Sequence, residues 1–190
     1  EVPYSLDPRK PAARAKLTAL WDEVATLLKP QSMHFGLDEV DMRGWPDDPE
    51  LVTELWGLHL PFLGHIAAKH GATMMLWGDK ALVPGEAVDA THGRSTEHAA
   101  RRRAALPKGA VITDWHYRAD ANPATFAPSL DVWRREGLGA IASTWYRPEN
   151  VRGFGAAAAV QGDVGLLQTT WAGYESSMEG LLREWRQFAV

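Results

Sequence analysis

The chain has 190 residues and a formal net charge of −4, with 45% hydrophobic and 23% charged residues, as in an ordinary soluble globular domain. It contains no cysteine, which excludes disulfides, thiol catalysis and cysteine-ligated zinc. No apolar run approaches the roughly 20 residues of a membrane-spanning helix, so no membrane partner is expected. We expect a single domain over residues 1–190. Because the chain begins at Glu1 without an initiator methionine or a signal-peptide pattern, we expect a processed chain or a fragment, with both a cytoplasmic and a secreted location open.

Helical and extended patterns alternate along the sequence. Apolar residues at helical spacing, with Leu20, Leu27 and Leu28 on one stripe, predict a first helix over 12–28. Further helices are predicted over 50–70, 97–105, 123–136, 148–160 and 178–188. Short apolar strands, bounded by Gly or Pro, are predicted over 32–36, 73–77, 110–115, 139–143 and 165–169. This order is typical of a parallel sheet with crossover helices.

Few other segments indicate a ligand. The basic residues are scattered apart from Arg101, Arg102 and Arg103, which we expect on a solvated helix face rather than at a nucleic-acid site. His92 and His98 are expected to face solvent. No spacing of His, Asp or Glu indicates a metal site, and no glycine-rich phosphate loop is present. We therefore expect neither a metal nor another cofactor.

Two adjacent carboxylates, Asp38 and Glu39, follow the first predicted strand with no Lys or Arg beside them. Neighbouring side chains of an extended backbone point to opposite sides, so both face one pocket only where the strand ends and the chain turns. One interpretation is a strand end followed by a helix-capping acid. The other is a pair of acids for acid–base chemistry on a polar substrate.

The chain contains nine tryptophans, which either fill a core or line a pocket for a flat apolar ligand face, such as that of a sugar ring. Four of the five predicted strands end at, or within two residues of, Trp77, Trp115, Trp145 and Trp171. In a parallel α/β barrel the carboxyl ends of all strands converge on one face. We therefore expect a sugar-processing pocket there. A core position is expected for Trp21, Trp56, Trp133 and Trp185, whereas Trp45 fits either environment.

These residues resemble the catalytic barrel of family-20 glycoside hydrolases, the β-N-acetylhexosaminidases. The family's hallmark is a strand ending His-x-Gly-Gly-Asp-Glu, and here the sequence reads His34-Phe35-Gly36-Leu37-Asp38-Glu39. Leu37 replaces the second glycine. The preceding helix carries Trp21-Asp22-Glu23-Val24, similar to the family's Trp/Tyr-x-Glu-Val stretch. The resemblance implies a TIM-type (β/α)8 barrel, of which this chain covers about the last five β/α units.

The resemblance also implies a reaction, the removal of terminal N-acetylhexosamine residues (GlcNAc or GalNAc) by substrate-assisted retaining hydrolysis. Glu39 would protonate the leaving oxygen and later activate water, and Asp38 would orient the acetamido group. Tyr146 would bind the acetamido oxygen and Glu175 a distal hydroxyl. The substrate-binding residues implied by the resemblance are His34 (as support beneath the acids), Trp77, Asp79, Trp115, Trp145, Tyr146, Trp171 and Glu175. The expected partner is this carbohydrate, and the missing first strands or a second copy would complete the barrel.

Two alternatives stay open at this point. The family's first barrel strand supplies an arginine that grips the sugar hydroxyls, and this chain does not contain that region. An inactive or divergent glycan-binding relative is therefore one alternative. The other is a barrel glycosidase that uses Glu39 as the acid and a separate carboxylate nucleophile, Asp79 or Asp114.

Overall fold

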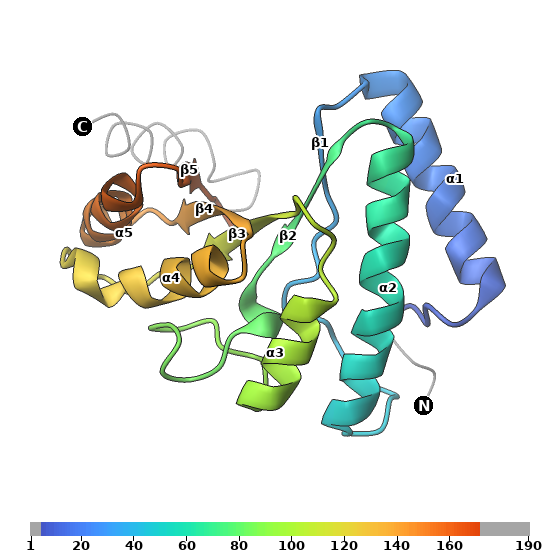
Figure 1. The fold of residues 1–190 in the computed structure, drawn as a ribbon, viewed down its shortest axis with the longest axis horizontal. Helices are drawn as coiled ribbons and strands as arrows, with labels where there is room; N and C mark the ends of the chain where they lie inside the picture. Colours follow the sequence, from blue (N-terminus) through green and yellow to red (C-terminus); the bar gives the residue numbers. More distant parts are fainter. Residues whose placement is uncertain (1–4, 172–190) are drawn as a thin grey trace.

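The computed structural model describes residues 5–171. The predicted helix over 178–188, together with Trp185 and the candidate residue Glu175, lies outside the described residues. Helices and strands alternate along the chain (Figure 1). In chain order they are α1 (Pro11–Leu28), β1 (Ser32–His34), α2 (Pro49–Lys69), β2 (Thr73–Trp77), η1 (Asp79–Ala81), α3 (Thr96–Ala104), β3 (Val111–Trp115), η2 (Pro123–Thr125), α4 (Ala127–Arg135), β4 (Gly139–Thr144), α5 (Pro148–Gln161) and β5 (Gly165–Gln168).

Proline and glycine set the limits of several elements. Helices α1, α2 and α5 each begin at a proline, which fits the first helical turn because its N–H would be unpaired anyway. Asp48 caps α2 by accepting a hydrogen bond from the backbone N–H of Glu50 at 2.9 Å. Strand β1 ends at His34, two residues before its predicted end, because the chain turns at Gly36 with a φ of 73°.

The five strands form one parallel sheet in the order β1-β2-β3-β4-β5. Figure 1 shows α1 and α2 beside the β1 side of this sheet and α4 and α5 beside β4 and β5. The prediction of a parallel α/β sheet with crossover helices is therefore confirmed for the described residues. The sheet curls as part of a barrel, with β1 and β5 as its two edges. None of the helices in residues 5–171 is long and apolar enough to cross a membrane.

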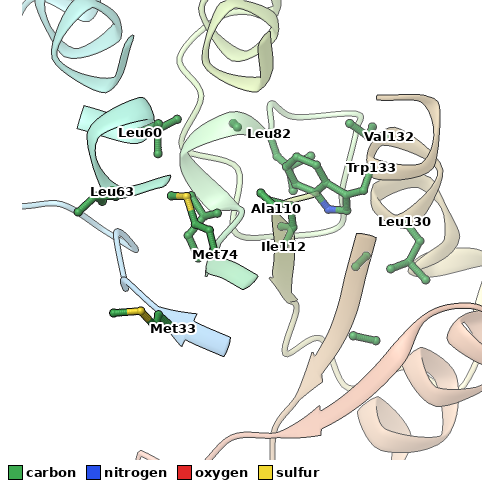
Figure 2. Packing of buried hydrophobic residues seen from close by; sticks show 14 of the residues in the cluster. Met33, Leu60, Leu63, Met74, Leu82, Ala110, Ile112, Leu130, Val132 and Trp133 are labelled. Atoms are coloured by element: carbon green, nitrogen blue, oxygen red, sulfur yellow. The ribbon is translucent and has the colours of Figure 1, made fainter. Parts of the chain in front are cut away.

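The hydrophobic core lies between one face of the sheet and the helices (Figure 2). Alternate strand residues, such as Met74 and Leu76 in β2, are buried there, whereas their neighbours on the other face are only partly buried. The indole of Trp133 in α4 is fully buried against this face. Full burial of each such side chain contributes about 1.5–3 kcal/mol. The expected core position is thus confirmed for Trp133, and Trp56 is buried as well.

Helix α1 forms over its predicted range, but three leucines of its apolar stripe are exposed. Leu20 is 54% exposed, and Leu27 and Leu28 are each 72% exposed. The helix packs beside α2 (Figure 1), so only a narrow side of it is covered by the described residues. Trp21 is on that side, with its ring centroid 4.6 Å from that of Phe35.

The arginine triplet also differs from its prediction, because Arg102 and Arg103 are buried at 1% and 8% exposure. The Arg102 guanidinium donates to the carbonyl of Lys80 at 2.8 Å, and burial lowers the pKa of this side chain to about 10. Arg103 forms ion pairs with Glu86 and Glu136. Consecutive residues point in different directions around a helix, so the triplet does not share one face. The two buried arginines, Arg102 and Arg103, donate hydrogen bonds to the segment that follows β2.

Gly78, between Trp77 and Asp79, provides a test of this packing. A Cβ at Gly78 would lie 2.6 Å from Cζ2 of Trp133 and 2.7 Å from Cγ2 of Ile112. We predict that Gly78→Ala lowers the free energy of unfolding by about 1–3 kcal/mol, because the core is overpacked. Gly57→Ala in α2 is the matched control, because a Cβ there meets no atom within 4 Å; it should stabilise by about 0.5–1 kcal/mol. Urea unfolding of both variants measures these changes, and a Gly78→Ala protein as stable as the wild type would contradict the packing.

Candidate active site

A cavity of about 330 Å3 is present beside the ends of the strands. Its lining consists of two acids and five aromatic residues: Asp38, Glu39, Trp77, Trp115, Tyr117, Trp145 and Trp171. Each lies at or just after the carboxyl end of a strand, where a parallel α/β barrel brings its loops together. The structure therefore brings the acid pair and the four predicted strand-end tryptophans to one cavity.

The acid pair sits in a turn with unusual backbone angles. Gly36, Leu37 and Glu39 have φ values of 73°, 74° and 38°, all in the left-handed region. Glycine adopts this region freely, whereas it costs an L-residue with a side chain about 1–2 kcal/mol. The turn places both carboxylates at the cavity although they are adjacent in sequence.

His34 supports this turn from beneath the cavity and does not line it. Its Nδ1 accepts the backbone N–H of Gly36 at 3.1 Å, and its Nε2 lies 2.7 Å from Oγ1 of Thr113. The Thr113 hydroxyl donates to the carbonyl of Leu76, so Nε2 of His34 carries the proton. Burial lowers the pKa of His34, although the charge of Asp38 opposes this shift. A neutral imidazole is the form that can accept the Gly36 bond.

Asp79 also lies beneath the cavity, with its side chain fully buried. Its Oδ2 accepts the backbone N–H of Glu39 at 3.1 Å and Nδ1–H of His92 at 2.8 Å. Its Oδ1 lies 3.4 Å from the indole nitrogen of Trp115. His92, which was expected to face solvent, is 37% exposed, but its imidazole is also paired with Asp79. The sequence does not indicate this pairing, because His92 lies 13 positions after Asp79, beyond an intervening loop.

The aromatic wall contains Tyr117, which sequence reasoning missed. Its ring centroid lies 5.1 Å from that of Trp115 and 5.4 Å from that of Trp145, and its hydroxyl accepts the indole N–H of Trp171 at 2.9 Å. The signal was available, because a residue two positions after Trp115 faces the same side of an extended chain. Tyr146, the tyrosine suggested by the family resemblance, is outside the cavity lining and packs edge-on against Trp145.

Trp45 lies outside the candidate site. Trp45 does not reach the acid cavity; it lines a separate, mostly apolar cavity of about 130 Å3 together with Leu37 and Trp56. The rings of Trp77 and Trp171 lie 6.2 Å apart between centroids.

Across residues 5–171, no group of three or more His, Asp or Glu side chains is arranged to hold a metal ion.

A buried ion cluster lies next to the aromatic wall. The imidazole of His116 is fully buried, with Nδ1 2.8 Å from Asp89 and Nε2 3.3 Å from Asp114. Burial alone would lower the pKa of His116, but the negative charges of Asp114 and Asp89 raise it to about 9. The second Asp89 oxygen accepts the backbone N–H of Tyr117 at 3.1 Å. The charged cluster thus fixes the segment that carries Tyr117.

The solved structures that match this chain include two glycosidases. A chitobiase from Flavobacterium johnsoniae aligns with 97% of this chain at 20% identity and a TM-score of 0.59. A family-20 exo-β-N-acetylglucosaminidase from Vibrio harveyi, solved in complex with N-acetylglucosamine, aligns with 73% of this chain at 17% identity and a TM-score of 0.48. The aligned region is 28% of the chitobiase chain and 19% of the Vibrio chain. No protein-family model and no curated protein matches the sequence. The chain therefore has a fold found in family-20 glycosidases and spans about a quarter of the length of the chitobiase.

Leu37 has a left-handed backbone conformation, which favours glycine over other residues. We therefore predict that Leu37→Gly is more stable than Leu37→Ala, the reverse of the usual order. Leu37→Gly and Leu37→Ala both remove the side chain beyond Cβ, so most of the lost packing is common to the two variants. At an ordinary position alanine is the more stable by about 0.5–1 kcal/mol. Here we expect the glycine variant to be more stable by about 1 kcal/mol, because it relieves the strain. Urea unfolding measures the difference, and an alanine variant of equal or higher stability would rule out a left-handed Leu37.

The ion cluster predicts a loss of stability at alkaline pH. Unfolded His116 titrates near pH 6.5, and folded His116 titrates near 9. Between these values the folded state binds more protons, so this stabilisation is full below about pH 6.5 and is lost as the pH rises through about 9. Urea unfolding between about pH 6 and about pH 9.5 should show this loss in the wild type and not in His116→Gln. Independently, 15N NMR should find both ring nitrogens of His116 protonated at about pH 8, where an unperturbed histidine is neutral.

Proposed function

We propose that this chain is the acid-bearing part of a glycoside hydrolase that removes terminal N-acetylhexosamine residues by substrate-assisted retaining hydrolysis. The observation that carries the proposal is the position of Asp38 and Glu39 at one cavity, facing four tryptophans. Paired acids provide proton transfer and electrostatic stabilisation, and flat indole rings pack against the C–H faces of sugars. The cavity, at about 330 Å3, is within the range of small-ligand pockets.

In the proposed reaction, the acetamido oxygen of the substrate attacks its own anomeric carbon. The bond from that carbon to the leaving oxygen breaks, and Glu39 gives its proton to the leaving oxygen. Asp38 accepts the acetamido N–H, which orients the amide and stabilises its developing positive charge. Water then attacks the anomeric carbon, Glu39 takes a proton from this water, and the ring of the cyclic intermediate opens.

Burial of the other carboxylates supports this route over one with a separate nucleophile. A nucleophilic carboxylate must reach the anomeric carbon in the cavity. Asp79 and Asp114 are 0% and 1% exposed, and neither lines the cavity. Asp79 accepts hydrogen bonds from three groups of the protein, and Asp114 is paired with His116. Neither is placed to attack a sugar.

Replacement of Glu39 tests the proposal. We expect Glu39→Gln to lower kcat/KM for methylumbelliferyl N-acetylglucosaminide by about 100-fold or more, because the amide cannot donate and retrieve the proton. Asp38→Asn should also lower kcat. Glu23→Gln, which changes an exposed acid on α1 in the same way, is the control and should keep wild-type activity. A methylthiazoline mimic of the cyclised intermediate should inhibit the wild type.

The possible failures are distinct. A wild-type chain that binds N-acetylglucosamine but does not hydrolyse the substrate would favour the glycan-binding alternative. Turnover that is unchanged in Glu39→Gln would remove Glu39 from the mechanism. Turnover without inhibition by the methylthiazoline would favour a nucleophile supplied by the protein.

A further inference from the structure

Asp79 combines full burial with contacts to two groups of the cavity. Its carboxylate accepts the backbone N–H of Glu39 at 3.1 Å, and it lies 3.4 Å from the indole nitrogen of Trp115. These two bonds join the end of β1 to the end of β3 through a residue that follows β2. One side chain therefore links the acid turn to the aromatic wall.

The third partner of Asp79 is His92, which forms two hydrogen bonds with it, one from its side chain and one from its backbone. Its Nδ1 lies 2.8 Å from Oδ2 of Asp79, and its backbone N–H donates to the carbonyl of Asp79 at 2.8 Å. A buried carboxylate is costly unless it is paired and hydrogen-bonded. The imidazole supplies a donor on the solvent side of Asp79, where it is 37% exposed.

The hydrogen-bond donors around residue 79 explain why this position needs a carboxylate. A backbone N–H and an indole N–H can only donate, and Nδ1 of His92 must donate to bind a carboxylate. Three donors therefore converge on two oxygens. An asparagine has one acceptor oxygen and an NH2 group, so at least one of the three donors would face another donor.

We propose that Asp79 is the positioning residue of the acid pair, holding the Glu39 backbone and the Trp115 indole in one arrangement, with the partly exposed His92 as its third partner. The proposal rests on the proposed function of Glu39 as proton donor. Asp79 acts through Glu39 and does not touch the sugar. The left-handed φ of 38° at Glu39 makes such an anchor necessary, because this conformation persists only where surrounding contacts hold it.

The first test measures the two hydrogen bonds and needs no turnover. In the wild type, the amide proton of Glu39 and the indole proton of Trp115 should be protected from solvent exchange in NMR, although Glu39 itself is exposed. Asp79→Asn should speed exchange at one or both by about tenfold or more, as expected for loss of a bond to a charged acceptor. Asp131→Asn is the matched control, because this partly exposed carboxylate on α4 pairs with Arg134 and Gln161, outside the cavity lining.

The second test asks whether the arrangement serves proton donation. A dinitrophenyl leaving group departs without a proton, whereas the alcohol leaving group of chitobiose needs one. Asp79→Asn should therefore lose at least about tenfold more kcat on chitobiose than on dinitrophenyl N-acetylglucosaminide, with KM nearly unchanged. Glu39→Gln should show the same selectivity, and Asp131→Asn should show none.

The outcomes separate this proposal from the proposed function. Unprotected protons in the wild type, or exchange unchanged in a folded Asp79→Asn protein, would overturn the positioning role. Equal losses on both substrates would overturn its link to proton donation. A wild type that cleaves neither substrate would overturn the proposed function, and the exchange experiment would still decide whether Asp79 holds Glu39 and Trp115. If Asp79→Asn does not fold, the exchange rates of the Glu39 amide proton and the Trp115 indole proton in the wild type decide whether Asp79 holds these two groups.

Discussion

The register of one parallel sheet determines where every part of the candidate site lies. In β3, Thr113 lies opposite Trp77 and Trp115 lies opposite Ser143, so these side chains share the face away from the helices. A shift of one residue would exchange the two faces. It would turn the apolar strand residues of Figure 2, such as Met74 and Ile112, out of the core and the aromatic wall into it. Packing against the helices therefore fixes the register, and the register fixes the cavity.

Between the apolar core and the cavity lies a layer of buried and partly buried polar groups. Four of them hold a backbone segment that carries a cavity residue. His34 holds the N–H of Gly36, Asp79 that of Glu39, and Asp89 that of Tyr117. Asn150 does the same for Trp145, whose N–H it accepts at 2.9 Å. Since a buried acceptor without a donor is costly, each bond also restricts the rest of the fold. Pre-organisation of this kind keeps a site in one geometry before a ligand arrives.

The sequence predicted the elements better than the contacts between them. Strand β2 matches its predicted limits of 73–77, because a short apolar run between Gly and Asp has few alternative structures. The predicted helix over 123–136 instead begins as η2 and continues as α4. Pro128, which has no N–H, lies at the start of α4. The spacing of apolar residues along the chain was therefore sufficient to predict the order of helices and strands, although not every helix and strand boundary.

Contacts across the fold were less predictable, because they depend on which side of an element a residue faces. The aromatic residues at the strand ends were found from spacing alone, since parallel strands converge. His92 and Arg102 were expected at the surface, and both are bound to groups distant in sequence. The family resemblance suggested Tyr146 for the cavity, whereas Tyr117 lines it. Spacing identifies a strand end, but only the folded chain shows which of two nearby tyrosines faces inward.

The edges of the sheet have a consequence for the protein in solution. Within residues 5–171, β1 pairs only with β2 and β5 only with β4. Leu166 and Leu167 of β5 are 38% and 39% exposed. An unpaired strand with apolar side chains is a template for the backbone of another chain. The solubility of the chain therefore depends on what covers β5, because an uncovered edge would favour self-association at high concentration.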